Sequence, residues 1–268
     1  QKLQTNLNRA PSWGFIHIWS VNMKKYFIHA ITNYVSIYNV AAIIKATGAY
    51  PIMADDFNES ASITKNADAL YINLGMLNED KKIAMKNSIR VANEKGIPIV
   101  VDPVGIGASE YRREFFFEIL KEIKSGVIKA NLSEILSIYN DEKSHGVDNE
   151  HEMSEDEKTG VLQKLSKKYG IIFVMTGEAN IAADGNEFVK VSGGSEMLKN
   201  IVGSGCMLGG IVAASVSKGL SLKSVKEALE CSRDASLLAE KNKKCGPMEF
   251  LNAYIDSVHK NREESIWI

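Results

Sequence analysis

Residues 67–109, ADALYINLGMLNEDKKIAMKNSIRVANEKGIPIVVDPVGIGAS, contain three segments with different hydrophobic patterns. The first, 67–75, is mostly apolar and has the length of a buried strand. The second, 77–96, has the pattern of an amphipathic helix, with Gly96 as its stop signal. The third, 97–109, is an apolar strand followed by a loop with two glycines. Strand, helix and strand in this order favour a parallel pair of strands.

The same alternation continues along the chain from about residue 27. Strands are expected at 26–33, 126–131 and 171–177, a hairpin at 180–191, and helices at 34–48, 111–126, 131–140, 162–170, 205–218, 223–242 and 247–260. This pattern predicts an α/β fold with a mostly parallel central sheet and helices on both faces. No linker divides it, so residues 27–268 are predicted to form one domain. Residues 1–26 have no predicted place in it, and they lack the features of a signal peptide.

The composition bears on the partners and the compartment. The 268 residues carry a formal net charge of −1, which gives no electrostatic reason to bind nucleic acid or an anionic membrane. The apolar runs are too short to span a bilayer. Three cysteines (Cys206, Cys231 and Cys245) show no CxxC spacing, so we expect reduced thiols in a cytoplasmic protein. Small molecules and other proteins remain as the expected partners.

Polar or glycine-rich loops follow four of the expected strands. They are DPVGIGAS (102–109), KANLSE (129–134), TGEAN (176–180) and VGSGC (202–206). In an open α/β sheet, ligands bind outside the carboxyl ends of the strands. Each loop alone is weak evidence, because glycine turns and helix caps are common. Together they predict a ligand site at this end of the sheet.

The last of these loops has the pattern of an anion site. Gly203 and Gly205 bracket Ser204, and Cys206 begins an apolar helix. Backbone N–H groups at a helix N-terminus stabilise anionic oxygens, and glycine allows the backbone to approach them closely. The turn at 203–206 is therefore the expected phosphate site.

An ordered set of motifs resembles the hydroxyethylthiazole kinase family, a thiamine-salvage branch of the ribokinase-like superfamily. The motifs are HAITNYV (29–35), ATGAYPIMAD (46–55), INLGMLN (72–78), GIPIVVDPVGIGAS (96–109), IKANLSEI (128–135), MTGEAN (175–180) and GSGC (203–206). The resemblance runs from about residue 27 to 255. It departs from the family at Ala130, where glycine is usual, and at Val202, where threonine is usual.

The resemblance implies a fold, an activity and an assembly. The fold would be ribokinase-like. The activity would be phosphorylation by ATP, with Mg²⁺, of the primary alcohol of 4-methyl-5-(2-hydroxyethyl)thiazole. The family forms homotrimers with active sites between subunits, so the same assembly is expected on resemblance alone.

The resemblance also assigns residues to the nucleotide and its metal. Lys129 resembles the family's basic nucleotide contact, although strand-end lysines often lie on the surface. Thr176 and Gly177 resemble a further ATP contact, or they only form a tight turn.

Asn131, Glu134 and Asp102 complete this group. Asn131 is a further candidate nucleotide contact, and Glu134 is expected to organise Mg²⁺ through water. The simpler interpretation of Asn131 and Glu134 is a helix-capping pair. Asp102 is expected to hold Mg²⁺ or a phosphate-bound water, or else to cap its loop.

For the thiazole, the family points to Asn33, Met53 and Gly203. Met53 would offer a soft thioether surface to an aromatic ring. Asn33 would hydrogen-bond the substrate, although loop asparagines often bond their own backbone. His29 is expected to be structural.

Cys206 stands where the wider superfamily usually has an aspartate base. A helix N-terminus favours the thiolate over the thiol, so Cys206 is predicted to accept the alcohol's proton. The alternative is a buried thiol that only lines the pocket while ATP receives the proton.

Two other functions remain open at this point. One is a kinase of a related hydroxymethyl heterocycle, such as a pyrimidine or pyridoxal, which Cys206 disfavours. The other is a thiazole- or nucleotide-binding protein without turnover, which Val202 and Ala130 make plausible and which the retained Asn131, Glu134 and GSGC turn argue against.

Overall fold

The computed structural model of this protein describes residues 24–143, 153–241 and 246–264. Within these ranges the chain forms an eight-stranded sheet in the order β2-β1-β3-β4-β5-β6-β7-β8. Strands β1 to β6 pair in parallel, and β7 and β8 are antiparallel. The strands are β1 (Phe27–Ile31), β2 (Tyr50–Ile52), β3 (Ala69–Asn73), β4 (Ile99–Asp102), β5 (Gly126–Asn131), β6 (Ile172–Thr176), β7 (Ala179–Ala183) and β8 (Phe188–Ser192). The predicted mostly parallel sheet is confirmed.

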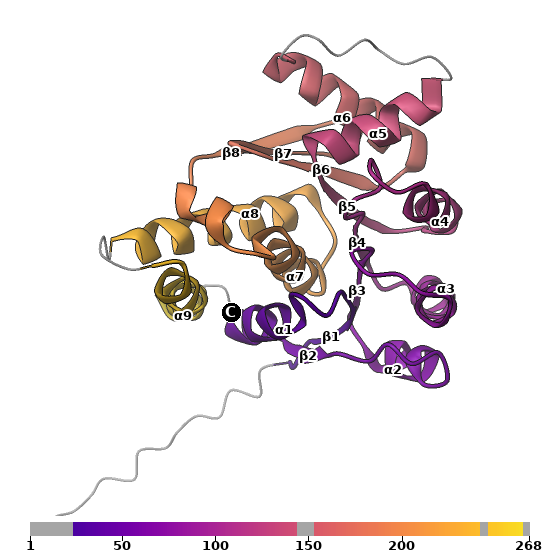
Figure 1. Ribbon diagram of the computed structural model, residues 1–268, viewed down its shortest axis with the longest axis horizontal. Coiled ribbons are helices and arrows are strands. Elements are labelled where there is room, and N and C mark those ends of the chain that lie inside the picture. Colours follow the sequence, from indigo (N-terminus) through magenta and orange to yellow (C-terminus); the bar gives the residue numbers. More distant parts are fainter. Residues whose placement is uncertain (1–23, 144–152, 242–245, 265–268) are drawn as a thin grey trace, which may run out of the picture.

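Helices cover both faces of the sheet, as predicted (Figure 1). Helices α2 to α6 lie on one face, and α1, α7, α8 and α9 lie on the other. The helices are α1 (Ile37–Ala46), α2 (Ser60–Asn66), α3 (Glu79–Lys95), α4 (Glu110–Leu120), α5 (Leu132–Lys143), α6 (Glu155–Tyr169), the 3₁₀ helix η1 (Glu196–Asn200), α7 (Ser204–Val216), α8 (Leu222–Glu240) and α9 (Pro247–Glu264). Each face has its own apolar core, with Met207 in one and Phe116 in the other.

The segment β3–α3–β4 shows how sequence signals position polar groups. Asn78 caps α3, since its side chain accepts a hydrogen bond of 2.8 Å from the backbone N–H of Lys81. Gly96 ends the helix in the left-handed conformation, with φ of 71°. The parallel register then sets Asn73 opposite Asp102, at the carboxyl ends of adjacent strands.

Helix α7 packs directly on β3 and β4. A Cβ atom at Gly209 would lie 2.6 Å from the hydroxyl of Tyr71, so the helix approaches the sheet closely because this residue is glycine. The residues from Cys206 to Ala214 are buried. The predicted buried core helix is confirmed, and its first turn lies against the ends of the central strands.

The two edges of the sheet are short or charged. Strand β2 has three residues, including Pro51, which lacks a backbone N–H. On β8 the Lys190 ammonium pairs with the carboxylate of Glu155 on α6 at 2.5 Å.

Two further expectations concern membranes and thiols. Among the described helices, none is long and apolar enough to cross a bilayer. Cys206 and Cys231 are free thiols, as expected, and Cys245 lies outside the described residues.

Candidate functional site

The first turn of α7 brings together the residues predicted at 203–206. Gly203 is the N-cap, and its φ of 83° is a left-handed conformation. A Cβ atom there would lie 2.7 Å from Cβ of Ser36, so both backbone and space require glycine. The N–H of Ser204 donates to the carbonyl of Ile201, so it is less available to a ligand than the sequence suggested. The amides of Gly205 and Cys206 lie in the first turn, where a helix supplies no acceptor.

Lys129 and Asp102 form a buried ion pair beside this turn. The ammonium lies 3.1 Å from Oδ1 of Asp102, and the two residues are 3% and 1% exposed. Lys129 is therefore no surface lysine. Burial raises the pKa of Asp102, while the nearby Lys129 ammonium acts in the opposite direction. A Cβ atom at Gly205 would lie 3.4 Å from Nζ, which places the cation next to the predicted phosphate site.

Asn131 and Glu134 make the reciprocal contacts of a capping pair. Oδ1 of Asn131 accepts from the N–H of Glu134 at 2.9 Å, and Oε2 of Glu134 accepts from the N–H of Asn131 at 2.9 Å. Oε1 of Glu134 also accepts from the N–H of Gly105 at 3.0 Å. The capping interpretation is thus correct for the geometry. Glu134 can still accept a hydrogen bond from a metal-bound water, because each carboxylate oxygen has more than one lone pair.

The donor set suits Mg²⁺ only through water. Within the described residues, no group of three or more His, Cys, Asp or Glu side chains could hold a metal. Both oxygens of Asp102 already have partners in Lys129, Tyr71 and Asn73. Glu134 is 8% exposed and retains acceptor capacity for a metal-bound water. Mg²⁺ commonly keeps several waters and binds substrate phosphates, so Glu134 fits and Asp102 fits less well.

Thr176 and Gly177 lie on the same rim of the sheet. Thr176 is opposite Asn131 in the β5–β6 register, and its hydroxyl donates to the carbonyl of Ala130 at 3.3 Å. The N–H of Gly177 donates to Oδ1 of Asn180 at 3.4 Å, which is the tight turn given as the alternative. Their contact with ATP stays a prediction.

Of the three predicted thiazole residues, Gly203 is the N-cap described above, and Asn33 lies next to the cysteine. Nδ2 of Asn33 lies 3.5 Å from Sγ of Cys206. Met53 is half-buried just after β2 and packs against the apolar core on the α7 face. His29 is buried and contacts Oγ1 of Thr64 at 2.8 Å and the carbonyl of Ala54 at 2.7 Å, as expected of a structural residue.

Asn73 is a central residue that sequence reasoning missed. Its Nδ2 donates to Oδ2 of Asp102 at 3.0 Å and to Sγ of Cys206 at 3.3 Å. Its Oδ1 accepts from Nδ2 of Asn33 at 2.9 Å and from the N–H of Gly75 at 2.9 Å. The only signal in the sequence is a polar residue at the end of an apolar strand.

Tyr71 is a second residue that was missed. Its hydroxyl donates to the carbonyl of Cys206 at 2.9 Å and lies 3.3 Å from Oδ2 of Asp102. Burial raises its pKa well above the ordinary value, and the Asp102 carboxylate raises it further, so the phenol stays neutral. Tyr71 therefore fixes the first turn of α7 to the sheet.

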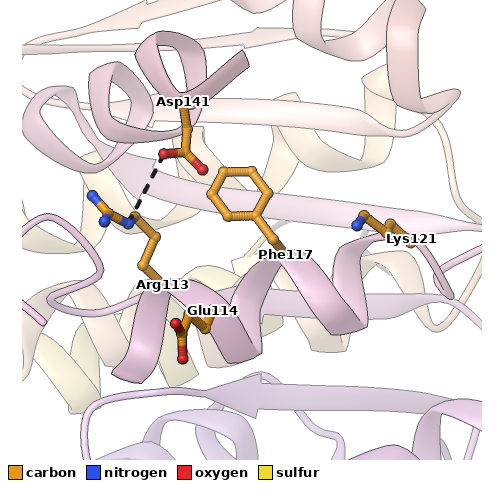
Figure 2. A pocket seen from close by; sticks show the side chains of 5 residues that line it. All are labelled: Arg113, Glu114, Phe117, Lys121 and Asp141. Atoms are coloured by element: carbon orange, nitrogen blue, oxygen red, sulfur yellow. Dashed lines mark ion pairs between the residues drawn. The ribbon is translucent and has the colours of Figure 1, made fainter. Parts of the chain in front are cut away.

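A cavity of 370 Å³ lies elsewhere, between α4 and α5 (Figure 2). It is lined by Arg113, Glu114, Phe117, Lys121 and Asp141. None of the predicted site residues lines it, so this cavity is separate from the candidate site.

Comparisons with known proteins identify the family of this chain. The model of the hydroxyethylthiazole kinase family matches residues 18–264. A hydroxyethylthiazole kinase from Clostridium beijerinckii is 38% identical over 244 residues, which cover 89% of this chain and 88% of that protein.

Solved structures give the same result for the fold. The hydroxyethylthiazole kinase of Pyrococcus horikoshii OT3 superposes with a TM-score of 0.80 at 30% identity, covering 88% of each chain. A ribokinase-like superfamily protein from Enterococcus faecalis V583 superposes with a TM-score of 0.61 at 14% identity, covering 88% of this chain and 87% of that one, and shows the fold alone. The fold is therefore ribokinase-like, and the chain belongs to the hydroxyethylthiazole kinase family.

Proposed function

We propose that this chain transfers a phosphoryl group from ATP to the primary alcohol of 4-methyl-5-(2-hydroxyethyl)thiazole, in thiamine salvage. The observation that carries the proposal is the first turn of α7. There Cys206 contacts Asn33, and the Lys129 ammonium lies beside Gly205. One helix turn would thus carry a phosphate site and an alcohol site next to each other, and family membership supports the same chemistry.

The phosphate site would work by charge neutralisation and positioning. The amides of Gly205 and Cys206 offer N–H groups at the positive end of the helix dipole. Lys129 adds a buried positive charge, and its partner Asp102 holds it in place at 3.1 Å. Thr176 and Asn131 would contact the nucleotide from the neighbouring strand ends. Mg²⁺ bound with ATP would neutralise charge on the phosphate oxygens, and Glu134 would hold it through water.

Cys206 is the proposed acceptor of the alcohol's proton. The bond that forms joins the alcohol oxygen to the γ-phosphorus, and the bond that breaks joins this phosphorus to the oxygen bridging to the β-phosphate. ADP leaves, and the alcohol proton passes to Sγ. Two amide groups, of Asn33 and Asn73, donate to this sulfur and hold Sγ in place at the first turn of α7.

A coupled ADP-release assay with a panel of alcohols tests the reaction. We expect turnover with the thiazole alcohol and much lower turnover with hydroxymethyl-pyrimidine and pyridoxal. Faster turnover with either of these would assign the protein to the related heterocycle kinases. Binding of the thiazole without ADP release would leave a non-catalytic binding protein.

Two variants test the base. Cys206→Ala should lower kcat by about 10²-fold or more with little change in thiazole affinity, and Cys206→Asp should retain activity. The measurement is kcat against pH, with thiazole affinity measured separately. If the alanine variant matches the parent across the pH range, Cys206 only lines the pocket.

We also propose a homotrimer with the thiazole site completed by a neighbouring subunit. Four apolar side chains near this site are exposed: Tyr34 (54%), Val35 (67%), Tyr38 (80%) and Phe57 (38%). They lie on or beside the loops that carry Asn33 and Met53. Exposed apolar side chains on two adjoining loops are typical of a protein interface.

Sedimentation velocity tests the assembly. Tyr38→Glu should dissociate the trimer, whereas Phe188→Glu, at an exposed aromatic residue on β8, should not. A parent protein that is a fully active monomer would remove this proposal. A cytoplasmic location and a single domain from residue 27 remain proposals, supported by the free thiols and by one continuous sheet.

A further inference from the structure

Lys81, in the first turn of α3, is buried although lysine is rarely buried without a partner. Its side chain is 2% exposed. Nζ donates to the backbone carbonyl of Thr32 at 2.8 Å and lies 3.3 Å from Oδ2 of Asp55. It also lies 3.7 Å from the ring centroid of Tyr34, close enough for a cation–π contact.

These partners come from two loops that are distant in sequence. Thr32 and Tyr34 belong to the loop after β1, and they flank Asn33. Asp55 belongs to the loop after β2, two residues beyond Met53. The hydroxyl of Tyr34 donates to Oδ2 of Asp55 at 2.8 Å, so the two loops also contact each other directly.

Burial of the Lys81 ammonium is unfavourable, and the fold of α3 does not require a charged residue at this position. Moving an ammonium out of water is unfavourable, and an apolar residue at this place on α3 would avoid that penalty. A buried charge placed at a junction is therefore better explained by the geometry it imposes than by stability. Here it fixes the loop carbonyl of Thr32 and the carboxylate of Asp55 on either side of one ammonium.

The loop after β2 is held from its other side as well. Nε2 of His29 lies 2.7 Å from the carbonyl of Ala54, between Met53 and Asp55. Two buried side chains therefore fix consecutive residues of this loop, and Met53 directly precedes them.

We propose that Lys81 is a positioning residue that joins the two loops bearing Asn33 and Met53 and so sets the shape of the thiazole-alcohol site. Its effect on the substrate rests on the proposed function, whereas its effect on the loops does not. Its polar partners Thr32 and Asp55 lie in these two loops, so we expect Lys81 to act mainly on thiazole binding.

The test compares Lys81→Met with Lys82→Met. Lys82 is the next residue on the same helix, and its ammonium pairs at 3.2 Å with Glu79, whose side chain is exposed. Lys81→Met should raise KM for the thiazole alcohol about tenfold through loss of loop preorganisation, with kcat and KM for ATP unchanged within about twofold. Lys82→Met should change none of them. Lys81→Arg keeps the charge and should restore most of the affinity.

Amide hydrogen exchange measures the loops without any substrate. In Lys81→Met, residues 32–36 and 53–58 should exchange at least about threefold faster than in Lys82→Met, because the contacts that order both loops are lost. Equal exchange in the two variants overturns the proposal, and so does a fall in kcat with unchanged KM. A parent protein that does not bind the thiazole alcohol would contradict the proposed function, while the exchange result would still decide the role of Lys81.

If Lys81→Met does not fold, Asp55→Asn takes its place in both measurements. This variant keeps the shape of the side chain and removes the charge that faces Nζ. It should accelerate exchange in the same two loops and raise KM in the same direction. Unchanged exchange and KM in Asp55→Asn would equally overturn the proposal.

Discussion

Gly203→Ala tests whether the turn before α7 is held by sterics as well as by backbone conformation. The φ of 83° costs an L-residue about 1–2 kcal/mol compared with glycine. The new Cβ would also lie 2.7 Å from Cβ of Ser36, whereas carbon atoms pack at about 3.5–4.0 Å. One of the two elements must therefore move by about 1 Å, and overpacking of this kind costs about 1–3 kcal/mol.

The displacement would reach the substrate residues through Ser36. Ser36 is 1% exposed, and its N–H and hydroxyl both donate to Oδ1 of Asn33 at 3.0 Å. Asn33 in turn contacts Sγ of Cys206. Gly203→Ala should therefore lower the free energy of unfolding by about 2–5 kcal/mol and weaken both ATP and thiazole binding.

Gly193→Ala is the matched control. Its φ of 85° is nearly the same, but no atom lies within 4 Å of the added Cβ. Gly193→Ala should lower the free energy of unfolding by about 1–2 kcal/mol and leave the affinities for ATP and thiazole unchanged. Urea unfolding and titration calorimetry measure these quantities. If the two variants lose equal stability and both bind ATP and thiazole normally, the steric contact with Ser36 has no effect and the reasoning is wrong.

Three more predictions concern single residues. Gly205→Val should weaken ATP binding about tenfold or more in calorimetry and leave thiazole affinity within about twofold, because the added branches block the approach of phosphate to the helix amides; equal losses for both ligands would speak against the phosphate site. Asn73→Ala should lower the free energy of unfolding, measured in urea, by about 2–4 kcal/mol, because Asp102 and the N–H of Gly75 lose a buried partner. A loss below about 1 kcal/mol would mean that water replaces the amide. Burial lowers the pKa of His29 below 6.5, so the folded protein binds this proton less readily than the unfolded chain and the parent should lose stability as pH falls below 6.5. His29→Gln should lose less over the same range, and identical curves would show that His29 does not contribute.

The sequence predicted those helices and strands whose apolar periodicity and stop signals lie within the segment itself. The strand–helix–strand unit at 67–109 was predicted because its apolar periods and its stop glycine agree. Helix α2 (Ser60–Asn66) was missed, since its seven residues are mostly polar and show no apolar periodicity. Strand β2 was missed because it is three residues long and contains a proline.

The residues of the candidate site also differ in whether the local sequence predicts them. The glycine turn at 203–206 and the polar strand ends carry recognisable local signals, and the structure brings them together. Lys81 carries no such signal, and Asn73 carries only the weak one of a polar residue at the end of an apolar strand. Lys81 stands in an amphipathic helix where lysine is usually solvated, and its burial arises from two loops that fold over it. Asn73 gains its partners only when β4 and α7 pack against β3.

The two edge strands of the sheet, β2 and β8, limit how copies of this protein can associate with each other. A strand that added beside β2 would find only three residues to pair with, one of them Pro51, which has no N–H to donate. At the opposite end, β8 carries Lys190, whose charge disfavours an incoming strand. Growth of the sheet from one molecule into the next is therefore discouraged on both sides. Copies of this chain would therefore have to associate through side-chain surfaces and not by extending the sheet.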